Sequence, residues 1–102
     1  MPTYVSLINW TDQGIRNVKQ STERAKAFKD MAEKLKVKVR EIHWTMGRYD
    51  VVVVVDAPDD RAISRLMLGL GILGNARTET LRAYSSQEMS LILEGIPQGS
   101  AG

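Results

Sequence analysis

The chain has 102 residues, 43% of them hydrophobic and 25% charged, which is typical of one soluble globular domain. The formal net charge of +2 gives no basic stripe for nucleic acid, and the absence of cysteine, together with a single histidine, excludes disulfides and predicts no metal site. No apolar run approaches the roughly 20 residues that span a bilayer and no leader precedes the first element, so we expect a cytoplasmic protein.

The first element that the pattern predicts is a β-strand over residues 3–10, with apolar side chains in both phases. Thr11 or Asp12 then supplies a helix N-cap. Apolar residues recur at helical spacing from Ile15 to Leu35, with charged residues on the other side. This spacing predicts one long amphipathic helix that lies on a flat surface.

Residues 37–46 and the five valines at 51–55 predict two strands, joined by a short connection that contains Gly47. Such a connection is typical of a β-hairpin. The apolar phase shifts within 37–46, and either a bulge near Arg40 or an edge strand with two partly covered faces would explain the shift. Because alternation would expose every second valine, both faces of the valine strand must be covered.

A second helix is predicted to begin near Pro58 and to end at Gly74. Gly69 and Gly71 are costly inside a helix, and they indicate close approach of another part of the chain or of a ligand. Close packing of another part of the chain is favoured over contact with a ligand.

Residues 75–84 predict a fourth strand, and the capping box from Ser85 to Glu88 opens a short last helix. Residues 95–102 are rich in glycine, proline and serine and predict a mobile tail. Residues 1–94 therefore form the single expected domain.

The order β-α-β-β-α-β, followed by a terminal helix, predicts an α+β, ferredoxin-like fold. Its four-stranded antiparallel sheet carries both main helices on one face. The other face has no cover within the chain, although the strands carry apolar residues in both phases. We therefore expect a homodimer, or a higher homo-oligomer, that packs sheet against sheet.

This topology brings the end of the first strand, the hairpin and the start of the fourth strand to one edge of the sheet. The N-terminus of the first helix is expected there too, where its N–H groups could meet an anion. Aromatic and polar groups around an apolar sheet indicate a cleft for a small molecule. The candidate ligand-binding residues at this edge are Asn9, Trp10, Trp44, Asn75 and Arg77.

Three residues of the hairpin are candidates for catalysis: His43, Tyr49 and Asp50. His43 is the only side chain that titrates near neutrality, which makes it a candidate for proton transfer, although a lone histidine is more often structural. Asp50 could instead pair with an arginine or accept hydrogen bonds near Trp10, and this structural interpretation is favoured.

Three separated motifs resemble the GYD domain family. They are Thr3–Arg16 (TYVSLINWTDQGIR), Trp44–Asp50 (WTMGRYD) and Gly74–Thr78 (GNART). The family takes its name from the Gly-x-Tyr-Asp motif, present here as residues 47–50. The resemblance implies a bacterial protein related in fold to the dimeric α/β barrels, in which two ferredoxin-like subunits pack their sheets together. In those proteins ligands enter between the sheet and the helices of each subunit.

The wider superfamily includes cofactor-free monooxygenases, haem-degrading and haem-binding enzymes, and polyketide cyclases. Haem degraders of this fold resemble the chain in using asparagine, as at Asn9, but their histidine lies on a helix and His43 lies on a predicted strand. No cofactor is predicted other than a haem by this analogy. Two hypotheses stay open: a small-molecule enzyme or binding protein, and a non-catalytic oligomerisation or interaction module.

Overall fold

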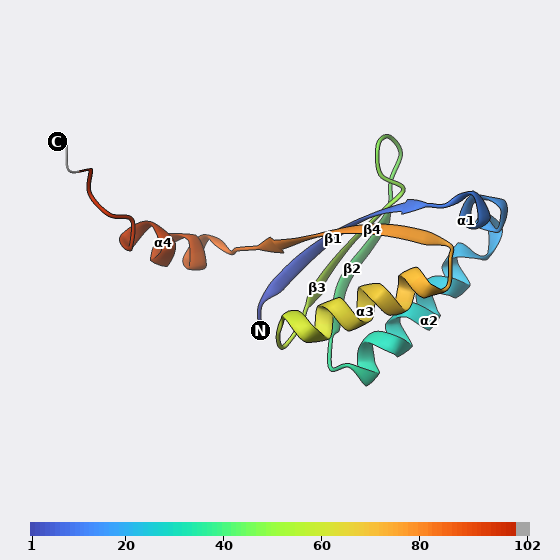
Figure 1. Cartoon of the computed structure of the whole chain (residues 1–102), viewed down its shortest axis with the longest axis horizontal. Coiled ribbons are helices and arrows are strands. Elements are labelled where there is room, and N and C mark those ends of the chain that lie inside the picture. Colours follow the sequence, from blue (N-terminus) through green and yellow to red (C-terminus); the bar gives the residue numbers. More distant parts are fainter. Residues whose placement is uncertain (100–102) are drawn as a thin grey trace.

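The computed structural model describes residues 1–99. In chain order the elements are β1 (Thr3–Trp10), α1 (Asp12–Arg16), a 3-10 turn (Val18–Gln20), α2 (Ser21–Lys34), β2 (Lys38–Trp44), β3 (Val51–Asp56), α3 (Asp60–Ile72), β4 (Ala76–Ala83) and α4 (Ser86–Glu94). The strands form an antiparallel sheet in the order β2-β3-β1-β4, and α2 and α3 lie side by side on one face of it (Figure 1). The predicted α+β, ferredoxin-like fold is confirmed.

The core lies between the sheet and the two long helices because alternate residues of the central strands point toward them. Tyr4, Ser6 and Ile8 of β1 are buried on this face, as are Val51, Val53 and Val55 of β3. The helices bury their apolar stripes against these residues, with Phe28 and Ala32 from α2 and Ala62, Ile63, Leu66 and Met67 from α3. Ser6 is the buried polar member, and its hydroxyl lies 2.7 Å from the Thr80 hydroxyl.

Within residues 1–99, no helix lies over the opposite face of the sheet (Figure 1). Five apolar side chains occupy its centre, and we call them the open face: Val5 and Leu7 of β1, Val52 and Val54 of β3, and Leu81 of β4. The first four are half-buried by their neighbours, and Leu81 is 48% exposed. Both faces of the valine strand were predicted to be covered; α2 and α3 cover one face, and cover for the open face by a second chain stays a prediction.

The prediction of one long helix from residue 12 to residue 35 was wrong, because the α-helix is interrupted between Asn17 and Gln20. α1 packs tightly on the connection before β4: a Cβ built on Gly14 would lie 1.9 Å from the Asn75 carbonyl oxygen. α2 must instead lie along the sheet, so the chain changes direction through the 3-10 turn. The Arg24 guanidinium stabilises the break by donating to the Asn17 carbonyl oxygen at 2.7 Å.

Several smaller predictions are confirmed. The pairing of β2 with β3 shifts register between Val39 and Glu41, which confirms a bulge near Arg40, and β2 is also an edge strand, the other explanation for the phase shift. Thr11 is the N-cap of α1, where its side chain accepts from the Gly14 N–H. Close packing holds for Gly69 alone, where an added Cβ would lie 2.8 Å from the Met31 sulfur; the same atom on Gly71 would meet open space.

α4 projects beyond the end of β4, away from the rest of the fold (Figure 1). Its predicted capping box is confirmed, with reciprocal hydrogen bonds between Ser85 and Glu88. The mobile tail predicted over residues 95–102 stays a prediction, and its last three residues lie outside the described part of the chain. Among residues 1–99, no helix combines the length and the apolar character needed to cross a membrane.

Candidate functional site

Asp50 links the start of β3 to the end of β1. Its carboxylate accepts a hydrogen bond from the Trp10 backbone N–H at 2.9 Å. Its own N–H donates to the Ile8 carbonyl oxygen at 2.9 Å, and its carbonyl oxygen accepts from the Thr45 N–H at 2.9 Å. Asp50 therefore holds the hairpin to β1 with two hydrogen bonds and closes the hairpin itself with the third.

The rest of the Gly-x-Tyr-Asp motif shapes the loop between β2 and β3. Gly47 has a φ of +112°, a backbone conformation that residues with a Cβ rarely adopt. The Thr45 hydroxyl donates to the Tyr49 carbonyl oxygen at 2.6 Å and closes the loop from inside. The Tyr49 hydroxyl donates to the Glu79 carboxylate at 3.3 Å, which ties the loop to β4.

The first and third motifs hold each other at the same edge of the sheet. The Thr11 N–H donates to the Asn75 carbonyl oxygen at 3.1 Å, and the Thr11 hydroxyl donates to the Gly74 carbonyl oxygen at 2.6 Å. The Gln13 amide donates to the Asn75 side-chain oxygen at 2.9 Å. The Thr11 hydroxyl also caps the Gly14 N–H at 3.1 Å. Among the N–H groups at this helix start that were predicted to meet an anion, those of Gly14 and Ile15 therefore donate to Thr11 instead.

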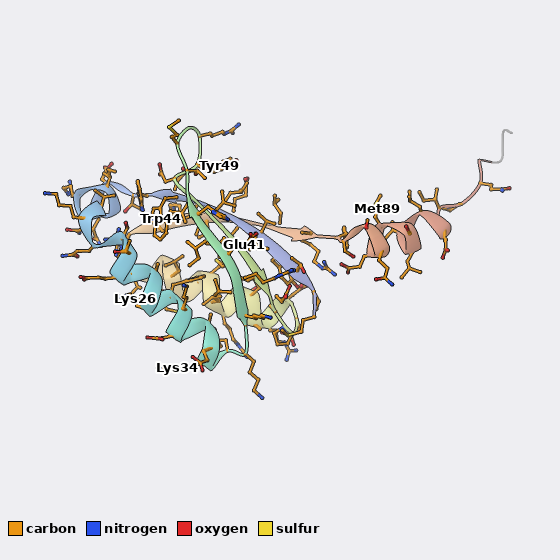
Figure 2. All side chains as sticks on the ribbon, turned by 180° about the vertical axis from the view of Figure 1, so that it is seen from behind. Lys26, Lys34, Glu41, Trp44, Tyr49 and Met89 are labelled. Atoms are coloured by element: carbon orange, nitrogen blue, oxygen red, sulfur yellow. The ribbon has the colours of Figure 1, made fainter. Side chains whose placement is uncertain are left out.

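A cavity of about 120 Å³ lies between α2 and the sheet, at the end near the hairpin. Its walls are almost entirely apolar, and Trp44, which is 44% exposed, lies on the α2 side of β2 (Figure 2). The polar side chains at its wall are few, chiefly an arginine of α2 and an asparagine before β4. The lining residues include Trp10, Arg24, Phe28, Met31, Ile42, Trp44, Leu70 and Asn75.

The sheet separates the predicted ligand-binding residues into two groups. Trp10, Trp44 and Asn75 line the cavity. Asn9 and Arg77 are paired neighbours on β1 and β4, one residue out of phase with Trp10 and Ala76, and therefore lie on the opposite face. The predicted edge is correct, but it does not gather these five residues in one cleft.

The predicted catalytic residues do not meet at the cavity either. His43 pairs with Val52, on the open-face side of β2, and its side chain is 63% exposed with Nε2 3.7 Å from the Glu41 carboxylate. Asp50 bonds to the backbone and Tyr49 to β4, as described above. Sequence reasoning missed Arg24, Phe28 and Met31, whose helical spacing along α2 was the available signal.

Tyr4 and Glu88, two groups with shifted pKa values, lie outside this region. A hydrogen bond to Asp60, with burial as a second cause, raises the pKa of the Tyr4 phenol. A hydrogen bond from the Ser85 backbone, followed by one from the Arg82 guanidinium, lowers the pKa of Glu88. Both groups stabilise local structure near the ends of β1 and β4.

The cavity does not fit a haem. Its volume suits one small ring, whereas pockets for larger ligands measure about 300–1,000 Å³. His43, the single histidine of the chain, lies across the sheet from the cavity. Within residues 1–99, no group of three or more histidine, cysteine, aspartate or glutamate side chains is placed to hold a metal ion.

Comparison with known proteins gives three findings. A family model described as "GYD domain" matches residues 4–93. A Thermus thermophilus protein named "Glutamine synthetase and cystathionine beta-lyase binding protein" is 36% identical over 84 residues, covering 81% of this chain and 88% of that protein. A crystal structure of a Thermus thermophilus protein is similar with a TM-score of 0.49 and 27% identity, covering 83% of this chain and 95% of that chain.

Proposed function

The chain belongs to the GYD domain family, and we propose that it is a non-catalytic interaction module, a homodimer that packs sheet against sheet and binds other proteins. The observation that carries this proposal is the open face. The same side of the sheet is solvent-exposed within one chain, although its centre is made of valine and leucine.

The open face is continuous across three strands. Val5 pairs with Val54 on one side and with Leu81 on the other, and Leu7 pairs with Val52. Cross-strand partners of this kind lie about 4.5–5.5 Å apart between Cβ atoms, so the five side chains form one apolar surface. Burying apolar surface stabilises by roughly 25 cal/mol per Å², and a second sheet of the same kind is the simplest cover.

Charged residues flank the open face on both edge strands. β2 carries Arg40 and Glu41, and β4 carries Arg77 and Glu79. Each edge thus presents both signs of charge, which permits complementary pairing when the β2 edge of one subunit lies along the β4 edge of its partner. An apolar centre with a polar rim is the usual anatomy of a protein interface.

The arrangement of the hairpin supports a structural role for the motif residues. Asp50 is engaged by the backbone of Trp10, Tyr49 by Glu79, and His43 lies on the far side of the sheet from the cavity. Catalysis by these three residues would need them within reach of one substrate. None of the three lines the cavity, which favours a module in which the motif holds the hairpin in shape.

The relative named for its binding of glutamine synthetase and cystathionine β-lyase supports protein partners. We infer that the partners of this chain are enzymes of that kind. Immobilised chain should bind purified glutamine synthetase or cystathionine β-lyase saturably at micromolar concentration, with serum albumin as the control. Failure of both enzymes to bind above the albumin signal would contradict these partners.

Binding of a small molecule is a second candidate function, and the cavity between α2 and the sheet favours it. An engineered apolar cavity of about 150 Å³ binds benzene, so a single aromatic ring is the appropriate size. The guanidinium of Arg24 at the wall would suit an anionic group on that ring. Benzoate is therefore the probe of choice.

The test is a thermal melt with and without millimolar benzoate. Benzoate should raise the melting temperature of the wild-type chain because a ligand that binds only the folded state stabilises it by mass action. Ala25 lines the cavity, and the Ala25→Leu variant should fill the space and abolish the shift. An equal shift in both proteins would show that benzoate binds elsewhere.

A further inference from the structure

α4 carries an apolar stripe that the fold leaves exposed. Met89, Ile92 and Leu93 follow helical spacing, and each is at least 42% exposed, as is Ile96 just beyond the helix. Figure 2 shows Met89 far from the labelled residues of the sheet and of α2. The segment is also acidic, because residues 83–102 contain two glutamates and no lysine or arginine.

A groove of opposite charge lies between the end of α2 and the start of β2. Its open volume is about 360 Å³, and it is lined by Lys29, Glu33, Lys36, Val37, Lys38 and Val39. Three lysines and one glutamate give it a positive character. The valines and the aliphatic stems of the lysines supply apolar surface beneath the charges.

The groove and the base of α4 lie at the same end of the sheet. β4 ends at Ala83, which pairs with Thr3; Thr3 pairs with Asp56, and Asp56 pairs with Lys38. Within one chain, however, β2 and β4 are opposite edges, three strand spacings or ~14 Å apart. α4 projects outward from β4 and away from its own groove (Figure 1).

We propose that α4 of one chain docks into the groove between α2 and β2 of its partner, an inference that rests on the proposed sheet-to-sheet dimer. When the β4 edge of one subunit lies along the β2 edge of the other, the end of β4 meets the start of the partner's β2. α4 then reaches the partner's groove, where Glu94 opposes the lysines, while Glu88 stays bound to Ser85 and Arg82 of its own chain. The dimer exchanges two such helices by symmetry.

The backbone at Lys36 supports this assignment independently. Lys36 follows the end of α2 with a φ of +59°, a position where glycine is strongly preferred. A lysine at this position has a less favourable backbone conformation than glycine would have, but it places a positive charge at the groove. Strained residues of this kind concentrate at functional surfaces.

Cysteine cross-linking tests the docking directly, because the chain contains no cysteine. Lys38 lies in the groove and Leu93 on α4, and both are exposed. The double variant Lys38→Cys, Leu93→Cys should form interchain disulfides on mild oxidation and run as a covalent dimer on a non-reducing gel. Each single variant can join only two copies of the same cysteine, so it should run mainly as a monomer after the same oxidation, and its covalent dimer measures random collision.

Adding Lys36→Gly to the double variant should lower the cross-linked yield roughly twofold to fivefold, the effect of one surface ion pair. The fold should melt no lower, since glycine suits the positive φ. Lys26→Ala, on α2 but outside the groove (Figure 2), should leave the yield unchanged.

Three results would overturn the docking. The first is a double variant that has a dimeric mass by sedimentation but forms no interchain disulfide, or forms its disulfide within one chain. This result would overturn the docking of α4 and leave the sheet-to-sheet dimer intact. The second is an unchanged yield for Lys36→Gly. The third is a monomeric wild-type chain, which overturns the dimer as well, so the two failures can be told apart.

Discussion

Asp50 shows how one side chain of a family motif can hold two strands together. Its carboxylate accepts a hydrogen bond from the Trp10 backbone N–H, which lies beyond the last residue pair of β1 and β3. Asp50 is half-buried, and removal of its carboxylate would leave the Trp10 N–H without a hydrogen-bond partner, which lowers stability.

The structural role of Asp50 predicts a graded series of variants. Asp50→Asn keeps one acceptor and should lower the free energy of unfolding by about 1 kcal/mol, whereas Asp50→Ala removes the acceptor and should cost about 1–3 kcal/mol. Urea denaturation measures both. Equal stability of wild type and Asp50→Ala would contradict the role of the Trp10 hydrogen bond.

Gly14 predicts a sharper effect at a single residue. A methyl group there would overlap the Asn75 carbonyl oxygen, so Gly14→Ala should force α1 from its place and cost about 1–3 kcal/mol. Gly71→Ala is the matched control, because its Cβ would meet open space and alanine favours the helix by about 0.5–1 kcal/mol. Opposite signs are expected in urea denaturation, and a neutral Gly14→Ala would show that α1 can move freely.

At the scale of elements, α4 projects from the body of its own chain, so within that chain its stability depends on the interactions at its N-terminus. Its capping box joins Ser85 and Glu88, and Arg82 of β4 lies 3.0 Å from the Glu88 carboxylate. Both neighbours favour the charged carboxylate and lower its pKa. A group with a depressed pKa stabilises the folded form above its unfolded pKa and loses that contribution as pH falls through the folded value.

The helicity of α4 should therefore decrease as pH falls below about 4.5, the ordinary pKa of glutamate, while the sheet persists. Cα chemical shifts of residues 86–94, followed through an acid titration, measure this local change. Glu88→Gln should start with lower helicity and lose the pH dependence. A titration that looks the same in both proteins would contradict the capping role of Glu88.

Elements with strong periodic patterns were predictable from the sequence, and the break between α1 and α2 was not. Apolar spacing continues through Asn17, so nothing local indicates a change of direction. The break is imposed by Gly14 against Asn75, a contact across about 60 positions of the chain. Tertiary packing of this kind overrides helix propensity.

The edge of the sheet at which the candidate residues lie was predictable from the sequence, but the face on which each one lies was not predicted. Strand order alone brings Asn9, Trp10 and Arg77 to one end of the sheet, as the pairing confirms. The alternation of side chains then places Trp10 toward the helices and the other two away from them. The cavity residues of α2 depend on how the helix settles on the sheet, which no motif in the sequence specifies.

At the scale of the whole molecule, the two faces of the sheet differ in what covers them. One face packs against α2 and α3 around Val53 and Leu66, which are 2% and 0% exposed. The other presents the open face to solvent. A chain of this size gains proportionally more from further burial than a large domain does, so association is the expected way to cover the open face.

Sedimentation equilibrium at tens of micromolar tests that central claim most directly. The wild-type chain should sediment at twice its 11.4 kDa mass. Val54→Asp, on the open face, should sediment as a folded monomer with an unchanged far-ultraviolet dichroism spectrum, because a charge would be buried unpaired in the dimer. Lys26→Asp, on the outer surface of α2, should stay dimeric. A wild-type chain that sediments at 11.4 kDa, or a Val54→Asp chain that stays dimeric, would contradict assembly through the open face.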